Sequence, residues 1–430
     1  MQDWQPTRRS VASWVIYDLA NTIFALGVGG LYFAQWLTEN DTPDIALALT
    51  IDAAMIVVIA TSPWLGAASD HATRRVRFLI PTTLLAVTAT FFLASVGVAG
   101  SLVIYAFALV GFNLGGVVYD ALLLDVSTEE TRGRISGLGV GVGYVGSIIA
   151  VVLGGVLLDA YGYPTLFRSI AIAFLLLALP AFFFIRERPR VRRPGPTAGI
   201  RAAITVLIEA WRRASTYRGV VPFLLGRFLY GDAINTLIAG FLTIFVINEL
   251  DFTDDEVQAL LALAIVTAIV GGITGGRLTD RLGPRRVLHF ALYVWMIAII
   301  GGIVAASADQ RSLVWLVGGA GGYALGATWA ADRVYMARIS PPRHLGEFYG
   351  LYATVGRFAT LLGPLSWGLI VNVFHLSRSV AMGALLAFLV AARVVLRLVD
   401  DEPRTWGPED LVPAVPRSGS NTFGKEPAGQ

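Results

Sequence analysis

Six polar side chains interrupt otherwise apolar stretches of this chain, where they could bind a small charged solute or carry a proton. Carboxylates can bind an ammonium group or hold a proton, and an arginine can bind a carboxylate through two hydrogen bonds. If these stretches cross a membrane, a charge near the bilayer centre costs ~2.5–3.5 kcal/mol on insertion scales and usually faces a cavity or a partner. The six residues are Asp18, Asn21, Asp120, Asp232, Asn235 and Arg333.

The same residues could instead form ion pairs that hold helices together. We prefer the cavity interpretation for Asp232, which lies near the middle of its apolar stretch, whereas both interpretations stay open for Asp18. Asn21 follows Asp18 by three positions and would share its face of a helix. A structural role is preferred for three further charged residues, Asp125, Arg338 and Arg357.

The composition indicates a membrane protein. Hydrophobic residues make up 55% of the 430 residues and charged residues 15%, whereas about 25% of the residues in a soluble domain are charged. Many uncharged stretches are long enough to cross the ~30 Å hydrocarbon core as helices of about 20 residues. Residues 1–10 lead directly into the first stretch, so we expect no removed signal peptide. The predicted spans are 11–36, 46–67, 78–98, 101–125, 135–158, 164–185, 220–247, 255–276, 287–307, 311–336, 347–371 and 378–399.

Parts of the sequence occur twice, in the same order. Residues 133–143 (GRISGLGVGVG) align with 346–356 (GEFYGLYATVG), and residues 17–22 (YDLANT) with 230–236 (YGDAINT). Between them, residues 66–70 (GAASD) align with 276–280 (GRLTD). Such a repeat predicts two homologous halves. In a chain this apolar, two parallel halves are typical of a secondary transporter with its site at the midplane.

Charged residues predict how the chain is oriented in the membrane. Arginine pairs such as Arg74-Arg75 and Arg285-Arg286 follow some spans, and acids such as Glu39 and Asp254 occupy the opposite loops. Because positive loops stay inside, we expect both termini and the central linker in the cytoplasm. The membrane is expected to be a bacterial inner membrane. The net charge of +3 then reflects topology, and we expect no nucleic-acid partner.

The domain organisation follows from the repeat. We predict a six-helix half at 1–185, a linker at 186–219, a second six-helix half at 220–400 and a disordered cytoplasmic tail at 401–430. Within the linker, residues 200–217 alternate apolar and charged positions at helical spacing. They predict an amphipathic helix, either on the inner leaflet or as a solvated linker helix.

The repeated loops carry glycine and aspartate four positions apart, followed by paired basic residues. Glycine lets helices approach closely, the aspartate can bind the positive end of a helix, and arginines can bind carboxylates and helix C-termini. We expect a clasp that holds the cytoplasmic side shut and breaks when that side opens. The clasp residues are Gly66, Asp70, Arg74, Arg75, Gly276, Asp280, Arg285 and Arg286.

These loops resemble the signature loop of the major facilitator superfamily, which implies twelve transmembrane helices in two pseudo-symmetric halves. Four segments narrow the resemblance to the autophagy-associated vacuolar amino-acid effluxer family and its bacterial relatives. They are residues 14–21 (WVIYDLAN), 230–236 (YGDAINT), 333–341 (RVYMARISP) and 346–352 (GEFYGLY). The resemblance covers most of the chain and implies that spans 1, 4, 7 and 10 line a central site.

The sequence departs from that family in two places. The family tends to show Tyr-Asn-Ala before a Leu-Pro pair in span 4, where this chain has Asp120 for the amide and Leu124 for the proline. In span 10 the family has a Gln and a Ser before the arginine, and this chain has Asp332 in that stretch. A carboxylate therefore replaces an amide near the expected site.

Several other chemistries are not expected. The chain has no cysteine, and its four histidines, at 71, 289, 344 and 375, lack metal-ligand spacing. Residues 141–146 (GVGYVG) match a dinucleotide fingerprint as a string but lie in an apolar span without a preceding strand. We interpret these glycines as a close helix contact and a flexible joint. No nucleophile–base pair appears, so we expect neither an enzyme nor a cofactor.

The sequence therefore predicts a monomeric carrier that works by alternating access. The family resemblance implies that it moves an amino acid or a similar zwitterion, by export, and an acid such as Asp232 or Asp18 would allow proton coupling. One alternative is a proton-driven exporter of drugs or metabolites. Another, of a different class, is a membrane sensor or scaffold that does not transport.

Overall fold

The chain is described by a computed structural model that covers residues 5–128, 131–188, 200–341, 345–399, 404, 406–407 and 410. Most of the predicted tail at 401–430 lies outside these residues, as does the side chain of Asp70. All elements within them are helical. They are α1 (Arg8–Phe24), η1 (Ala25–Tyr32), α2 (Phe33–Glu39), α3 (Asp44–His71), α4 (Val76–Phe92), α5 (Val98–Val126), α6 (Arg132–Phe184), α7 (Ile200–Thr216), α8 (Val220–Thr236), η2 (Leu237–Phe241), α9 (Leu242–Leu250), α10 (Asp254–Leu282), α11 (Pro284–Ser307), α12 (Arg311–Ile339), α13 (Leu345–Phe358), α14 (Leu362–Gly368), η4 (Leu369–Val373), α15 (Arg378–Val395) and η5 (Leu396–Leu398).

Nine of the described helical segments are long and apolar enough to cross a membrane. Several are built from consecutive helices, such as α1, η1 and α2, which run without a break from Arg8 to Glu39. The apolar helix α4 is shorter, at 17 residues. The predicted spans 135–158 and 164–185 form the single element α6, which is interrupted at Gly162, where φ is 71°. Helices therefore form where apolar stretches were expected, and the protein is a multi-pass membrane protein.

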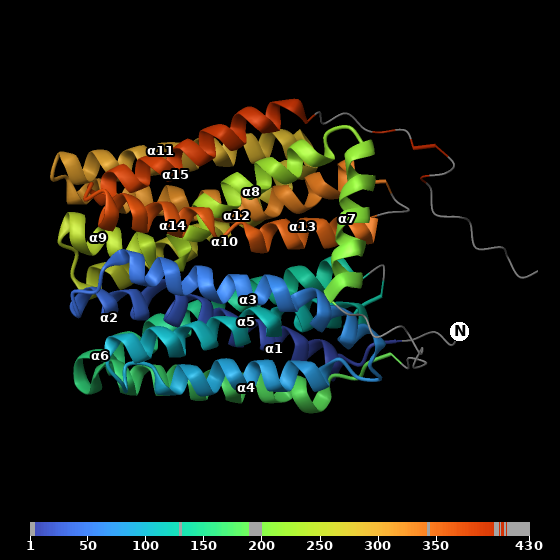
Figure 1. Cartoon of the computed structure of the whole chain (residues 1–430), viewed down its shortest axis with the longest axis horizontal. Helices are drawn as coiled ribbons and strands as arrows, with labels where there is room; N and C mark the ends of the chain where they lie inside the picture. The colour runs from blue at the N-terminus through green and yellow to red at the C-terminus, as the bar shows by residue number, and fades with distance from the viewer. Residues whose placement is uncertain are drawn as a thin grey trace, which may run out of the picture.

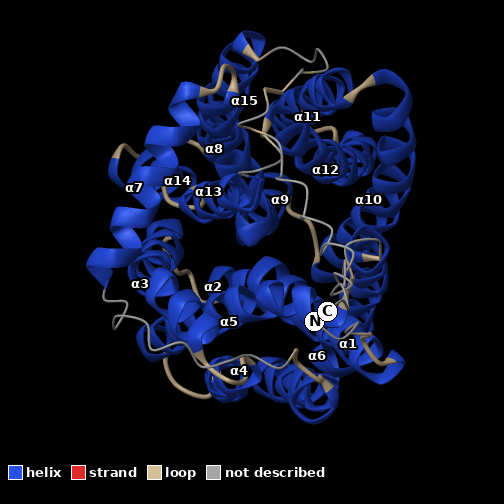
Figure 2. Cartoon of the chain, turned by 90° about the vertical axis from the view of Figure 1, so that its right-hand side faces the viewer, coloured by secondary structure: helices blue, strands red, loops and turns tan. Residues whose placement is uncertain are grey.

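The long helices run side by side, and α7 crosses them at one end (Figure 1). We call this the α7 end, and we call the opposite end, where α2 and α9 finish, the far end. In Figure 1 the helices before α7 lie below those that follow it. Figure 2, viewed from the α7 end, shows α7 along one flank of the bundle, where it packs against α3, α8 and α13.

Local sequence explains where individual helices begin. At α10, the Thr253 hydroxyl accepts a hydrogen bond from the Glu256 backbone N–H at 3.4 Å, and the Glu256 carboxylate accepts one from the Thr253 backbone N–H at 2.9 Å. This reciprocal capping satisfies N–H groups that the first turn leaves free. The next helix, α11, begins with Pro284 in its first turn, where a missing N–H costs nothing.

Glycines let α6 approach α1 and η1 closely. A Cβ added at Gly146 would lie 2.2 Å from the Leu19 carbonyl oxygen, and one at Gly154 would lie 1.7 Å from the Tyr32 hydroxyl. These positions share one face of α6, because they are eight residues apart, close to two turns. Gly141 lies off that face, and nothing stands within 4 Å of a Cβ placed there. The glycine-rich stretch is thus a helix contact, as the sequence indicated.

We expect Gly146→Ala to destabilise the protein by about 1–3 kcal/mol, because the added methyl overlaps the α1 backbone. Gly141→Ala, on the same helix, is the matched control and should leave stability unchanged or slightly raised. Thermal unfolding of the two purified variants in detergent checks this. Equal melting temperatures for Gly146→Ala and Gly141→Ala would contradict the assigned contact.

Candidate functional site

A cavity of about 280 Å³ lies between helices that precede α7 and helices that follow it. Its walls come from α1, η1, α3 and α5 on one side and from α8, η2, α13 and α14 on the other. The walls are mostly apolar, with a few polar groups, as in many small-molecule sites. The polar lining residues are Asn113, Asn235, Thr236, Arg357 and Thr360.

The helix that carries Arg357 is broken beside this cavity, and α8 satisfies the break. Because α13 ends at Phe358 and α14 begins at Leu362, backbone groups between them lose their helical partners. The Asn235 side-chain N–H donates to the Ala359 carbonyl at 2.8 Å, and an Asp232 carboxylate oxygen accepts from the Gly363 backbone N–H at 3.0 Å. Asp232 thereby caps the start of α14.

Asp232 is fully buried and is not part of the cavity lining. Its second oxygen, Oδ1, has no hydrogen-bond partner among the described residues. The neighbouring Thr236 donates to the Asp232 carbonyl at 2.7 Å and also lines the cavity. Asp232 is therefore a structural cap with one oxygen left over that could hold a proton.

Asp52 is a buried carboxylate that our sequence analysis did not single out. It lies on α3, is 8% exposed, and its Oδ1 has no partner in the part of the chain that the structure describes. Its charge interacts repulsively with that of Asp232. An acid in the middle of the apolar stretch 44–62 was the available signal. Asp52 lies on a helix before α7 and Asp232 on a helix after it. A proton bound to either carboxylate would remove its charge and with it the repulsion between the two.

A second buried charge cluster lies on α8, α12 and α13. The fully buried Asp332 forms an ion pair with Arg227 and accepts hydrogen bonds from the hydroxyls of Tyr230 (3.3 Å) and Tyr352 (2.9 Å). The Arg227 guanidinium lies 3.5 Å from the centroid of the Tyr352 ring and 5.6 Å from that of Trp329. The acid that departs from the family pattern in span 10 is therefore an ion-pair partner.

Asp18, Asp120 and Arg333 lie apart from the polar lining of the 280 Å³ cavity. The charge of Asp18 interacts with those of Asp120 and Arg333, and Asp120 also interacts with Arg357. Asp120 and Arg333 are exposed, whereas Asp18 is half-buried. The structure thus brings charges from α1, α5, α12 and α13 within electrostatic range of one another.

Of the six predicted site residues, one lines the cavity and one lies behind it. Asn235 lines it, and Asp232 holds the adjacent helix break. Asn21 is half-buried on α1 and is not part of this lining. Arg357, for which we preferred a structural role, lines the cavity, as does Asn113, which we had not selected. No group of three or more metal-ligating side chains occurs within the described ranges.

Two arginines of the predicted clasp, Arg75 and Arg285, bind nearby helix ends. Arg75 donates to the Ala121 carbonyl at 2.7 Å and pairs with Asp125 at 3.2 Å, which ties the loop after α3 to the end of α5. Arg285 donates to the Arg397 carbonyl at 3.4 Å. Among the other members, Arg74, Asp280 and Arg286 are exposed, Gly66 and Gly276 are half-buried, and the side chain of Asp70 lies outside the described part.

Polar contacts at the far end join helices before α7 to helices after it. Asp44, at the start of α3 and 3% exposed, accepts two hydrogen bonds from Arg378, each of 2.9 Å, and one from the Trp367 indole at 2.8 Å. Nearby, the Asn372 side chain accepts from the Ile45 backbone N–H at 2.7 Å. Gln35 adds a hydrogen bond to Asp254 at 2.9 Å. These contacts close the far end.

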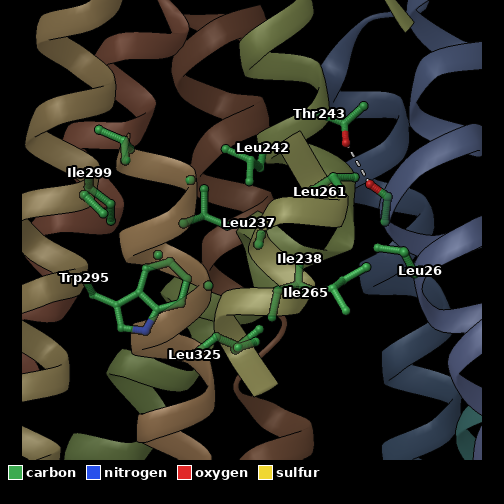
Figure 3. A pocket seen from close by; sticks show the side chains of 18 of the residues that line it. Leu26, Leu237, Ile238, Leu242, Thr243, Leu261, Ile265, Trp295, Ile299 and Leu325 are labelled. Atoms are coloured by element: carbon green, nitrogen blue, oxygen red, sulfur yellow. Dashed lines mark hydrogen bonds between the residues drawn. The ribbon is translucent and has the colours of Figure 1, made fainter. Parts of the chain in front are cut away.

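An apolar pocket of about 140 Å³ adjoins the polar cavity, and Ile238 lines both. Figure 3 shows Leu237, Ile265, Ile299 and Trp295 around it. The Trp295 indole N–H is a buried donor without a partner among the described residues. The pocket could take a small apolar group.

Comparison with known proteins identifies transporters. The family described as "Vacuole effluxer Atg22 like" matches residues 124–404. An "Uncharacterized MFS-type transporter YxiO" of Bacillus subtilis is 25% identical over 91% of this chain and 95% of its own length. "Autophagy-related protein 22-1" of Neosartorya fischeri is 23% identical over 74% of this chain and 56% of its own length.

The fold is also found among solved transporter structures. The nucleoside transporter NupG has a TM-score of 0.69 and 12% identity, covering 90% of this chain and 98% of its own. At this identity the likeness concerns the fold alone. The substrate of this chain stays open.

Asp332→Asn should cost about 3–5 kcal/mol of stability, because it leaves the buried Arg227 charge without its partner. A second substitution, Arg227→Met, should recover part of that loss in the double variant. Asp309→Asn, in an exposed turn, controls for loss of a carboxylate. Thermal unfolding compares these two single variants, the double variant and the control with wild type, and losses that simply add in the double variant would argue against the ion pair.

Proposed function

Because the chain belongs to the family described as "Vacuole effluxer Atg22 like", we propose that it is a secondary transporter that exports a small zwitterion such as an amino acid. The observation that carries this proposal is the 280 Å³ cavity between the helices on either side of α7, with one arginine and two amides in its lining. Arg357 would bind a substrate carboxylate through two hydrogen bonds. Asn113 and Asn235 would accept from the substrate ammonium group.

We propose the twelve-helix architecture in two halves, at 1–185 and 220–400, with the linker at 186–219 and the cytoplasmic tail at 401–430. Dividing α6 at Gly162 and counting α4 and α12 as spans brings the nine apolar segments to twelve. Following the positive loops, we place the α7 end in the cytoplasm of a bacterial cell and the far end outside its inner membrane. The protein would act as a monomer.

Transport would proceed by alternating access. Closure at the far end, through Asp44 and Arg378, corresponds to a conformation that exposes the cavity toward the α7 end. When the α7 end closes instead, the predicted clasp of Gly66, Asp70, Arg74, Arg75 and its repeat Gly276, Asp280, Arg285, Arg286 would form. A substrate would reach the cavity along Asp18, Asn21, Asp120 and Arg333.

Proton coupling is supported by Asp52 and Asp232. Each is buried and has one oxygen without a hydrogen-bond partner within the described residues, and the two come from α3 and α8, which both contribute to the cavity walls. A proton taken up at one acid would remove their repulsion when the halves approach. Asp18 is the alternative proton site.

A second candidate function is export of apolar drugs or metabolites. The 140 Å³ apolar pocket with its single free donor on Trp295 favours it, because such a pocket accepts many shapes of apolar group.

The central test is uptake of labelled amino acids into proteoliposomes, with and without a pH gradient. Asp232→Asn should abolish the stimulation by the gradient while the protein stays folded, because asparagine can still cap α14. Asp309→Asn serves as the control and should transport like wild type. Absence of saturable flux for every amino acid would refute the proposed substrate class, whereas undiminished stimulation in Asp232→Asn would refute this proton site.

Arg378→Gln should open the far end, since it removes both hydrogen bonds that the Arg378 guanidinium donates to Asp44. The chain has no cysteine, so Asn113→Cys places a single thiol in the cavity lining. A membrane-impermeant thiol reagent applied from the far side should modify this thiol at least about tenfold faster in the Arg378→Gln background, as expected for loss of a buried charge-assisted contact. Equal rates would show that this ion pair does not control closure. Arg311→Gln, which removes a half-exposed pair with Glu256, is the matched control.

A further inference from the structure

A second, larger cavity of about 760 Å³ opens beside α7. Its walls come from α3, α7, α8 and α13, so it lies between a helix that precedes the linker and helices that follow it, with α7 across it. The lining is almost entirely apolar and includes Ile59, Ile208, Trp211, Phe228, Val355 and Phe358. Trp211 and Phe358 remain 38% and 39% exposed, as side chains that face lipid would be.

Arg357 is the cation in this apolar lining. It lines both the 760 Å³ cavity and the central 280 Å³ cavity, so it stands where the two adjoin. No hydrogen bond or ion pair engages its guanidinium among the described residues, although its charge interacts with that of Asp120. A guanidinium in an apolar wall binds a carboxylate strongly, because water competes weakly there.

The cavity has apolar walls and one cation, Arg357, where it adjoins the central cavity. A ligand with one acyl chain and one anionic head group would be complementary to it. We propose that this cavity binds a fatty-acid anion from the leaflet at the α7 end, with its carboxylate on Arg357 and its chain between α7 and α13. The positive charge of Arg357 favours an anionic ligand. The membrane-facing position of the cavity beside the amphipathic helix α7 favours an amphiphile. Because Arg357 also lines the central cavity, a fatty-acid carboxylate bound to it would compete there with a substrate carboxylate.

Dodecanoate binding to the full-length protein in lipid nanodiscs tests the proposal. We expect saturable binding of radiolabelled dodecanoate above that of empty nanodiscs, and weaker binding of dodecanol, which has the same chain and no charge. Arg357→Gln should weaken dodecanoate binding about tenfold or more, as loss of a charge-assisted hydrogen bond predicts. Arg357→Lys should retain most of it.

Two further variants separate the site from general membrane effects. Val355→Trp fills the cavity without changing charge and should also abolish binding, whereas Arg212→Gln, an exposed cation of α7 outside the lining, should not. Binding equal to that of empty nanodiscs would overturn the proposal. The proposal would also be overturned if dodecanol and dodecanoate bound equally and Arg357→Gln left that binding unchanged. The cavity would then hold only bilayer acyl chains.

Discussion

The structure depends on how α8 satisfies a broken helix within the membrane. Inside a bilayer, no water is available to unpaired backbone groups, so an interruption such as that between α13 and α14 must be satisfied by protein. Asn235 and Asp232 do this from one face of α8, one at each side of the break. They thereby fix the positions of Arg357 and Thr360, which line the central cavity. A carboxylate needed to hold the fold is thus placed beside the site.

The two ends of the molecule differ in a way that matters for transport. At the far end, buried and bidentate contacts of Asp44 with Arg378 join helices from either side of the linker. At the α7 end, Arg75 binds Ala121 and Asp125, all on elements before α7, and Arg285 binds η5, after it. Among the described residues, these contacts join helices on either side of α7 at the far end and tie each group to itself at the α7 end, which suits a hinge between conformations.

Much of the helix pattern could be predicted from the sequence, because apolar length and glycine spacing are local properties. The break inside α6 was placed correctly near residue 162, although the helix continues on both sides of it. The roles of single polar residues were harder to predict. A charge in an apolar stretch indicates a cavity or a partner, and only the fold decides between them: Asp332 proved to pair with Arg227, and Asp232 to cap α14.

Arg357 and Asp52 illustrate the same limit. Arg357 lies well inside its predicted span, and we preferred a structural role for it. In the structure the residue precedes a helix break and lines two cavities. The proposed role of Asp52 depends on its charge interaction with Asp232, which is distant in sequence. Neither the position of Arg357 between two cavities nor the interaction of Asp52 with Asp232 produces a local sequence pattern. Both arise where helices from separate parts of the chain meet.

Distances between spin labels at both ends test the central claim that the two ends open alternately. Labels at Thr42 and Ser377 report the far end, and labels at Thr73 and Arg281 report the α7 end, in a chain that has no native cysteine. Alternating access predicts two populations, in which the far-end distance shortens as the α7-end distance lengthens, with proportions that shift when the pH or the transported solute changes. A single, unchanging distance at each end under all these conditions would contradict it.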